Sequence, residues 1–220
     1  MNTFIGHLQT RLAQPLPGWR MQLRMAPQGR QGTPDFTIKP DVKKGSVLLA
    51  LYADGEELQI VFTLRGKHLS NHGGQISFPG GRMEPNETVQ QAALREAQEE
   101  TGITPDQVTL LGSLTELYIP PSNSLVYPQV GYLNRAPTFI AQASEVDDIF
   151  MVPLKRFVQP EARGSWERIL HDGKTYTLPV WHIHSSTPLW GATAMIMSEF
   201  VGLYEEFLGV PAFTSPLPTV

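Results

Sequence analysis

Several segments of the chain carry the hydrophobic pattern of β-strands. Residues 46–52 (SVLLALY) form a nearly continuous apolar run, which predicts a central strand. An Asp54-Gly55 turn joins this run to residues 58–65 (LQIVFTLR), so the two segments predict a hairpin. Similar patterns predict strands at residues 75–78, 108–114, 126–133, 146–152 and 176–183. We expect a loop at residues 118–125 and a polar insertion at residues 163–172.

Three other segments carry helical spacing. Residues 3–13 place Phe4, Ile5, Leu8 and Leu12 on one side of a predicted helix. A second helix is predicted at residues 89–101, and a closing helix at 190–208. The apolar face of the closing helix is expected to contain Ala194, Met197, Val201, Tyr204 and Leu208. Strands interleaved with substantial helices predict an α/β fold, with a mixed sheet sandwiched between helices.

Composition limits the class of protein. The chain has 220 residues, 41% hydrophobic, which is ample for one globular domain, and it contains no cysteine. A net charge of −4 argues against a general nucleic-acid-binding protein. No stretch reaches the ~18 apolar residues that suggest a membrane span. Because the N-terminus also lacks the pattern of a signal peptide, we expect a cytoplasmic protein with no membrane partner.

The chain divides into three parts on this evidence. We expect a helix and a proline-rich arm at residues 1–40, the main domain at residues 41–210, and a frayed tail at residues 211–220. The arm has three alternative roles: it wraps the domain, contacts a second subunit in a homodimer, or is partly disordered.

The helix at residues 89–101 is unusually acidic on one face. Glu96, Glu99 and Glu100 are three and four positions apart, so their carboxylates share that face and repel one another. Arg95 alone cannot neutralise three acids, whereas a hard divalent cation such as Mg²⁺ takes oxygen ligands. The alternative is a solvated acidic surface. Just before the helix, Gly80-Gly81 permits a backbone path that side chains would block, and Asn86 or Thr88 is the expected N-cap.

The wider pattern resembles a known motif. Gly81 is followed after five residues by Glu87, and after seven more by residues 95–103 (REAQEETGI). This spacing is similar to the Nudix box, with every fixed position filled. The resemblance implies a Nudix hydrolase with an α/β/α sandwich, which acts on a nucleoside diphosphate linked to another group. It implies Mg²⁺ or Mn²⁺ ligation by Glu96, Glu99 and Glu100 and by the Gly81 carbonyl, and a bracing ion pair between Glu87 and Arg95.

A segment before the box indicates one branch of the family. Residues 62–65 (FTLR) and 72–81 (HGGQISFPGG) resemble the signature of coenzyme A pyrophosphatases. The chain departs from it at Gly66, where Ser or Ala is usual, and at Ser70, where many members carry the Arg that would clamp phosphate. Arg65, Lys67 and Arg82 are therefore candidates for binding phosphate. For His72, substrate contact and a purely structural role in the loop both stay open.

The resemblance also implies a reaction. Metal on the helix glutamates would activate water, with a base drawn from those glutamates or from Glu145. Coenzyme A would give 4′-phosphopantetheine and 3′,5′-ADP. The alternatives are hydrolysis of ADP-ribose, dinucleotides or nucleoside triphosphates, and a Nudix-fold binding module without turnover.

Four further residues have a functional and a structural interpretation. Tyr118 or Tyr127 would stack an adenine, although packing is the commoner use of such rings. His182 and His184 share one strand face, but a pair without a third ligand favours ordinary, partly buried histidines.

Overall fold

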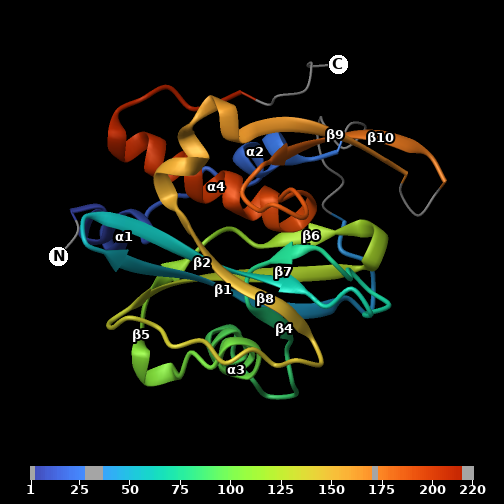
Figure 1. Ribbon diagram of the computed structural model, residues 1–220, viewed down its shortest axis with the longest axis horizontal. Helices are drawn as coiled ribbons and strands as arrows, with labels where there is room; N and C mark the ends of the chain where they lie inside the picture. The colour runs from blue at the N-terminus through green and yellow to red at the C-terminus, as the bar shows by residue number, and fades with distance from the viewer. Residues whose placement is uncertain (1–2, 28–36, 170–172, 215–220) are drawn as a thin grey trace.

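The computed structural model describes residues 3–27, 37–169 and 173–214. Figure 1 shows a central sheet with α3 on one face and α1, α2 and α4 on the other. This arrangement confirms the α/β/α sandwich that the sequence predicts.

The central sheet is mixed. Its eight strands are β1 (Lys43–Asp54), β2 (Glu57–Arg65), β3 (Ile76–Ser77), β4 (Gly80–Arg82), β5 (Val108–Ser113), β6 (Leu117–Ile119), β7 (Ser124–Leu133) and β8 (Val146–Pro153). The main path runs β3-β2-β1-β7-β5, while β4 pairs with β1, β6 with β7 and β8 with β2. β1 and β7 run parallel, and the other pairs are antiparallel.

The buried hydrophobic residues form two clusters, one on each face of the sheet, each covered by one or more helices. The helices are α1 (Thr3–Arg11), α2 (Trp19–Gln22), α3 (Val89–Thr101) and α4 (Gly191–Leu208), with short 3-10 turns at η1 (Leu23–Met25), η2 (Pro105–Gln107), η3 (Pro120–Ser122), η4 (Leu154–Val158) and η5 (Pro160–Ala162). Leu49 of β1 joins the larger cluster toward α4, whereas Leu48 joins a smaller one with Ala93 and Ala97 of α3. These alanines let α3 lie close to the sheet. Within the described residues, no helix has the length and apolar character to cross a bilayer.

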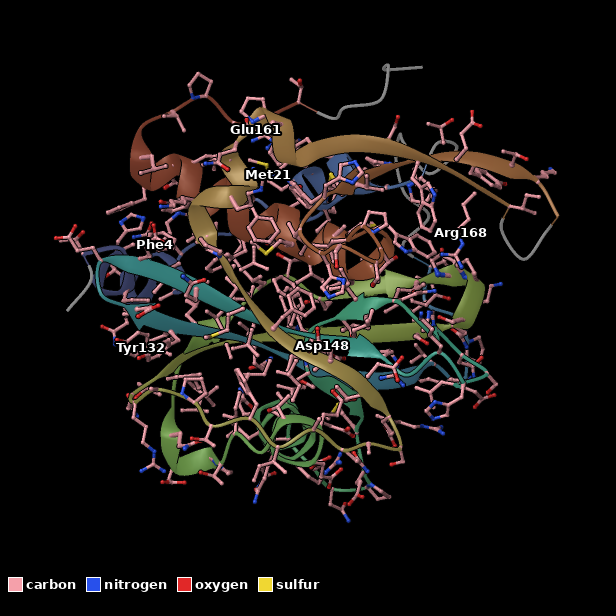
Figure 2. All side chains as sticks on the ribbon, viewed as in Figure 1. Phe4, Met21, Tyr132, Asp148, Glu161 and Arg168 are labelled. Carbon is pink, nitrogen blue, oxygen red and sulfur yellow. The ribbon has the colours of Figure 1, made fainter. Side chains whose placement is uncertain are left out.

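Helix α4 is buried more completely than its sequence pattern predicts. Glu199 and Phe200 are fully buried, whereas Leu208 of the predicted apolar face is 43% exposed. Ala194, Met197 and Val201 of the predicted face are fully buried, and burial extends beyond that face because α1, α2 and η1 also pack against α4. Figure 2 shows Phe4 and Met21 on the α4 side of the sheet, and Ser198 donates a hydrogen bond to the Met21 carbonyl at 2.6 Å.

The ends of the chain are more ordered than expected. Trp19–Gln22 and Leu23–Met25 are helical where we predicted an irregular arm, and they pack against α4. Residues 28–36 of that arm and residues 215–220 of the tail lie outside the described residues. Phe213 is only 5% exposed, so the prediction of a frayed tail is wrong at this residue.

Three strands were not predicted from the sequence, the first being β4 at residues 80–82. β6 lies where we predicted a loop, and β9 (Arg163–Ile169) lies where we predicted a polar insertion. β9 pairs with β10 (Thr175–Trp181) to form a separate two-stranded sheet, so the strand predicted to end at residue 183 ends at Trp181. Residues 170–172 lie outside the description. These strands are recognised by their hydrogen-bonded pairing with a neighbouring strand, because the hydrophobic pattern of their own residues is weak.

Candidate active site

The loop and helix of residues 80–102 fold through local signals. Thr88 is the N-cap of α3 and forms a capping box with Gln91. Gly102 ends the helix in the left-handed conformation with φ 76°. Asn86, the other candidate cap, instead turns the loop with φ 65°. Glu87 therefore precedes the N-cap and lies outside the helix.

The paired glycines bring the loop against both the sheet and the helix. β4 pairs with β1, with Gly81 opposite Ser46. A Cβ on Gly80 would lie 2.5 Å from the Ser46 carbonyl oxygen, which rules out a side chain there. A Cβ on Gly81 would overlap the Glu96 carboxylate. The missing side chain thus gives that carboxylate its place beside the β4 backbone.

Arg95 connects the loop to the acidic face. Its Nε donates to Glu87 Oε1 at 2.9 Å, and its Nη2 donates to Glu87 Oε2 at 3.1 Å and to the Arg82 carbonyl at 3.0 Å. Its Nη1 donates to Glu96 at 2.8 Å and to Glu99 at 3.3 Å. The hydrogen bond from Arg95 lowers the pKa of Glu87, and its carboxylate partners raise the pKa of Arg95. The ion pair that the motif implies is therefore present.

Glu100 is the most deeply buried acid on this face, at 1% exposure. Its Oε2 accepts a hydrogen bond from the Gly80 N–H at 3.1 Å, and its Oε1 accepts one from Arg65 Nη1 at 3.3 Å. Burial nevertheless raises the pKa of Glu100 to about 7, with smaller contributions from the charges of Glu96 and Glu145. Burial also raises the pKa of Glu96. Two carboxyl groups are thus costly to ionise here.

The structure places most predicted site residues in one region. Hydrogen bonds join these residues in two groups, one of Glu100 with Arg65 and Gly80, and one of Arg95 with Arg82, Glu87, Glu96 and Glu99. Glu145 directly precedes β8 and acts on Glu96 and Glu100 through its charge. His72 is exposed, with φ 60°, and its Nδ1 lies 3.1 Å from the Gln75 side-chain oxygen. That contact favours its structural role in the loop.

The acidic face has the donor chemistry of a divalent-cation site. Across the described residues, no three His, Asp or Glu side chains are already gathered as a metal site. Arg95 Nη1 donates to both Glu96 and Glu99, so the guanidinium already supplies some positive charge to these two carboxylates. The donors themselves fit a hard cation, because all are carboxylate oxygens and two have raised pKa values that a positive charge would relieve. The residues therefore suit Mg²⁺ or Mn²⁺ in chemistry and charge.

The two candidate stacking tyrosines have different surroundings. Tyr118 is 9% exposed, and its hydroxyl donates to Asn123 at 3.0 Å, so it serves packing. Tyr127 of β7 lies opposite Ser46 of β1, and Ser46 in turn lies opposite Gly81 of β4. Paired residues in a sheet share one face, which here is the face of α3. Tyr127 is thus in a cross-strand row with the glycine beside Glu96.

His182 and His184 show no paired ligand geometry. His184 Nε2 lies 3.3 Å from Asp148 Oδ2, and its Nδ1 lies 2.9 Å from the Ser186 hydroxyl. His182 is exposed and packs over Gly164. His184 is partly buried as predicted, whereas His182 is exposed, and both residues lie beyond the end of β10 at Trp181 and not on a strand face.

Comparison with known proteins identifies the family. The family model of the NUDIX domain matches residues 42–171, more than half of the chain. An uncharacterized Nudix hydrolase of Yersinia enterocolitica is 34% identical over 143 residues, covering 64% of this chain and 71% of that protein. The chain belongs to the Nudix family.

Other relatives carry more specific names. A peroxisomal coenzyme A diphosphatase of Mus musculus is 41% identical over 119 residues, covering 54% of this chain and 50% of that protein. A mitochondrial coenzyme A diphosphatase of the same species is 32% identical over 161 residues, covering 69% and 76%. The chain thus spans about half the length of the first of these relatives. The resemblance to the coenzyme A pyrophosphatase branch is confirmed at the level of sequence similarity.

Solved structures agree on the fold. A Nudix hydrolase from M. smegmatis aligns with a TM-score of 0.52 at 18% identity, covering 78% of this chain and 89% of that one.

Proposed function

We propose that the protein hydrolyses the pyrophosphate bond of coenzyme A or its derivatives, giving 4′-phosphopantetheine and 3′,5′-ADP. The observation that carries the proposal is the intact acidic face of α3, in which Glu96 and Glu100 lie against the β4 backbone and Arg95, held by Glu87, contacts Glu96 and Glu99. The similarity to coenzyme A diphosphatases supports the choice of substrate.

The chain's own residues have distinct roles in this proposal. A bound Mg²⁺ or Mn²⁺ would neutralise phosphate charge and acidify water, held by Glu96, Glu99, Glu100 and the Gly81 carbonyl. Glu145 or one of the helix glutamates accepts the proton of the attacking water. In the metal-free protein the pKa of Glu100 is about 7, and a bound cation would favour its carboxylate form. Water adds across the P–O–P bridge, so each product carries a phosphate monoester.

The candidates for binding the substrate phosphates are positively charged side chains at the edge of this region. Arg65 is anchored by Glu100, and its side chain is 23% exposed, so part of the guanidinium faces solvent. Arg82 is exposed in β4, and Lys67 is exposed just beyond β2. These three side chains supply positive charge where Ser70 replaces the usual Arg. His72 is a weaker candidate because its ring already contacts Gln75.

Tyr127 is our candidate for stacking the adenine. Replacing Tyr127 by Leu removes the aromatic face, and we expect KM to rise roughly tenfold, since stacking of a base contributes about 1–3 kcal/mol. Replacing it by Phe keeps the ring and should leave KM near the wild-type value. Steady-state kinetics on both variants checks this, and equal KM values for Leu and Phe would contradict the stacking role.

Hydrolysis of ADP-ribose, dinucleotides or nucleoside triphosphates is the second candidate, favoured by the departures at Gly66 and Ser70. A panel of coenzyme A, dephospho-coenzyme A, ADP-ribose, NADH and a nucleoside triphosphate separates the two, with Mg²⁺ and Mn²⁺ and products identified by mass. We expect coenzyme A to exceed its dephospho form in kcat/KM. The reverse order would transfer the proposal to the second candidate. Absence of turnover on every substrate would favour a binding module.

Location and assembly stay predictions. We keep the cytoplasm as the expected location, although relatives are named for peroxisomes and mitochondria. A homodimer is also kept as an expectation, to be checked by sedimentation equilibrium.

A further inference from the structure

The segment that follows β2 is fastened to the turn that precedes β8. Gly66 N–H donates to the Glu145 carbonyl at 2.8 Å, and Lys67 N–H donates to Asp147 Oδ2 at 3.1 Å. His68 Nε2 lies 2.9 Å from the Ser144 carbonyl. A carbonyl only accepts, so Nε2 carries the proton in this contact. Three consecutive residues thus hold the turn that carries Glu145.

This fastening extends the ladder between β2 and β8 past an irregularity. Arg65 lies opposite Val146, whereas Leu64 lies opposite Asp148, so the register shifts between Leu64 and Arg65. Figure 2 labels Asp148 on β8, which begins directly after the turn. Bulges of this kind re-aim the side chains beside them. The contacts of residues 66–68 fix the turn where regular pairing ends.

Gly66 makes the His68 contact possible. A Cβ at Gly66 would lie 2.6 Å from His68 Cε1 and 3.0 Å from His68 Nδ1. Any larger residue would therefore push the imidazole away from Ser144. Gly66 is also the position at which this chain departs from the Ser or Ala of the branch it resembles. The position of the His68 ring thus depends on the missing side chain at Gly66.

We propose that His68, seated over Gly66, is a positioning residue that holds the Ser144 carbonyl and so keeps the Glu145 carboxylate beside Glu96 and Glu100. The inference rests on the proposed function for its catalytic consequence, but its geometric part does not. His68 acts only through Glu145 and does not touch the substrate.

The first test is a double-mutant cycle in the full-length protein, using the substrate that the wild type hydrolyses. We expect His68→Ala to lower kcat roughly 10- to 100-fold with little change in KM, because small misplacements of a catalytic group have that cost. His68→Gln, whose amide N–H reaches about as far as Nε2, should recover most of the loss. In a Glu145→Gln background, His68→Ala should cost nothing further.

Gly66→Ala is an independent test of the contact between His68 and Ser144. It should reproduce the loss of kcat seen in His68→Ala, and it should add nothing when His68 is already alanine. The matched control is Gly164 and His182, where a Cβ would lie 2.6 Å from His182 Nε2 in the separate sheet of β9 and β10. Gly164→Ala creates the same steric conflict without touching Glu145, so kcat should stay at the wild-type value.

Mn²⁺ binding, measured by calorimetry, separates the two proposals. Because the charge of Glu145 acts on the proposed ligands Glu96 and Glu100, His68→Ala should weaken Mn²⁺ binding roughly tenfold in the wild-type background and have no effect in the Glu145→Gln background. If the wild type hydrolyses no substrate, the proposed function fails while this arm still decides the inference. The inference is overturned if His68→Ala binds Mn²⁺ as wild type does, or if its loss persists in Glu145→Gln.

Discussion

Glu100 is the residue at which burial and charge conflict most strongly. Its pKa of about 7 lies above the unfolded value of 4.5, so between these values the folded protein binds a proton that the unfolded chain has released. The resulting stabilisation is complete below pH 4.5 and is lost as pH rises through about 7. The metal-free protein should therefore become less stable toward alkaline pH because of this one group.

Glu100→Gln removes that dependence. Between pH 5 and pH 8 in EDTA, we expect the unfolding free energy of the wild type to fall by roughly 2–3 kcal/mol relative to the variant. Urea unfolding at both pH values measures the difference, independently of any constant cost of losing the contacts to Gly80 and Arg65. Parallel pH profiles for the two proteins would contradict a raised pKa at Glu100. We also expect the Glu100→Gln variant to lose nearly all turnover, because Glu100 is a proposed metal ligand.

Glu87 competes with Glu96 and Glu99 for hydrogen bonds from the guanidinium of Arg95. Two hydrogen bonds to Glu87 draw the guanidinium toward the loop, while Glu96 and Glu99 bind its third nitrogen. Glu87→Gln should leave Arg95 more firmly on the acids that bind metal, so we expect Mn²⁺ affinity to fall roughly tenfold. Calorimetric titration measures it. Asp106→Asn is the matched control, because it removes a carboxylate from the exposed Arg135 pair, and unchanged binding is expected there.

At the scale of elements, α4 holds the N-terminal helices through a buried carboxylate. Glu199 Oε1 accepts hydrogen bonds from Gly18 N–H at 3.1 Å and from the Thr115 hydroxyl at 2.6 Å, and Oε2 accepts one from Gln22 at 3.0 Å. Burial raises the pKa of Glu199, and these donors oppose that rise. One side chain therefore connects α2, the strand region near Thr115 and α4.

Glu199→Gln should destabilise the fold by roughly 1–3 kcal/mol, since one amide end would face the Gln22 donor. Glu206→Gln in the same helix is the control, because Glu206 is 51% exposed in its pair with Arg11 and should cost less than about 1 kcal/mol. Chemical denaturation of both variants provides the comparison. Equal costs would show that the buried network adds little to the docking of α2.

Local signals explain which elements the sequence could predict. Thr88, Gly102 and the Asp54-Gly55 turn act on their immediate neighbours, so the bounds of α3 and the β1–β2 hairpin follow from the sequence. β6 and β9 are defined by their pairing with the next strands along the chain, β7 and β10, and not by a strong hydrophobic pattern of their own, and a helical turn as short as α2 has no periodicity to detect. The same division holds at the site: the acidic face was readable from spacing, whereas the link from His68 to Ser144 joins residues 76 positions apart.

At the scale of the whole molecule, the N-terminal helices belong to the core of the folded unit. In the N-terminal part at residues 1–40, which we distinguished from the main domain, Phe4, Ile5, Leu8 and Met25 are at most 2% exposed within the larger cluster. Burying each such side chain contributes about 1.5–3 kcal/mol. The sum of roughly 6–12 kcal/mol is comparable with the total stability of a typical domain, about 5–15 kcal/mol.

A chain limited to residues 41–210 should therefore fail to fold stably, although it contains every predicted catalytic residue. Circular dichroism melting should show no cooperative transition, while the full chain melts sharply. A matched pair of point variants tests the same claim within the intact protein: Leu8→Ala, at a fully buried site, should cost roughly 2–5 kcal/mol, whereas Leu208→Ala, at 43% exposure, should cost much less. A truncated chain that melts cooperatively and keeps turnover would contradict this, because it would show that the sheet and α4 suffice to hold the α3 face in place.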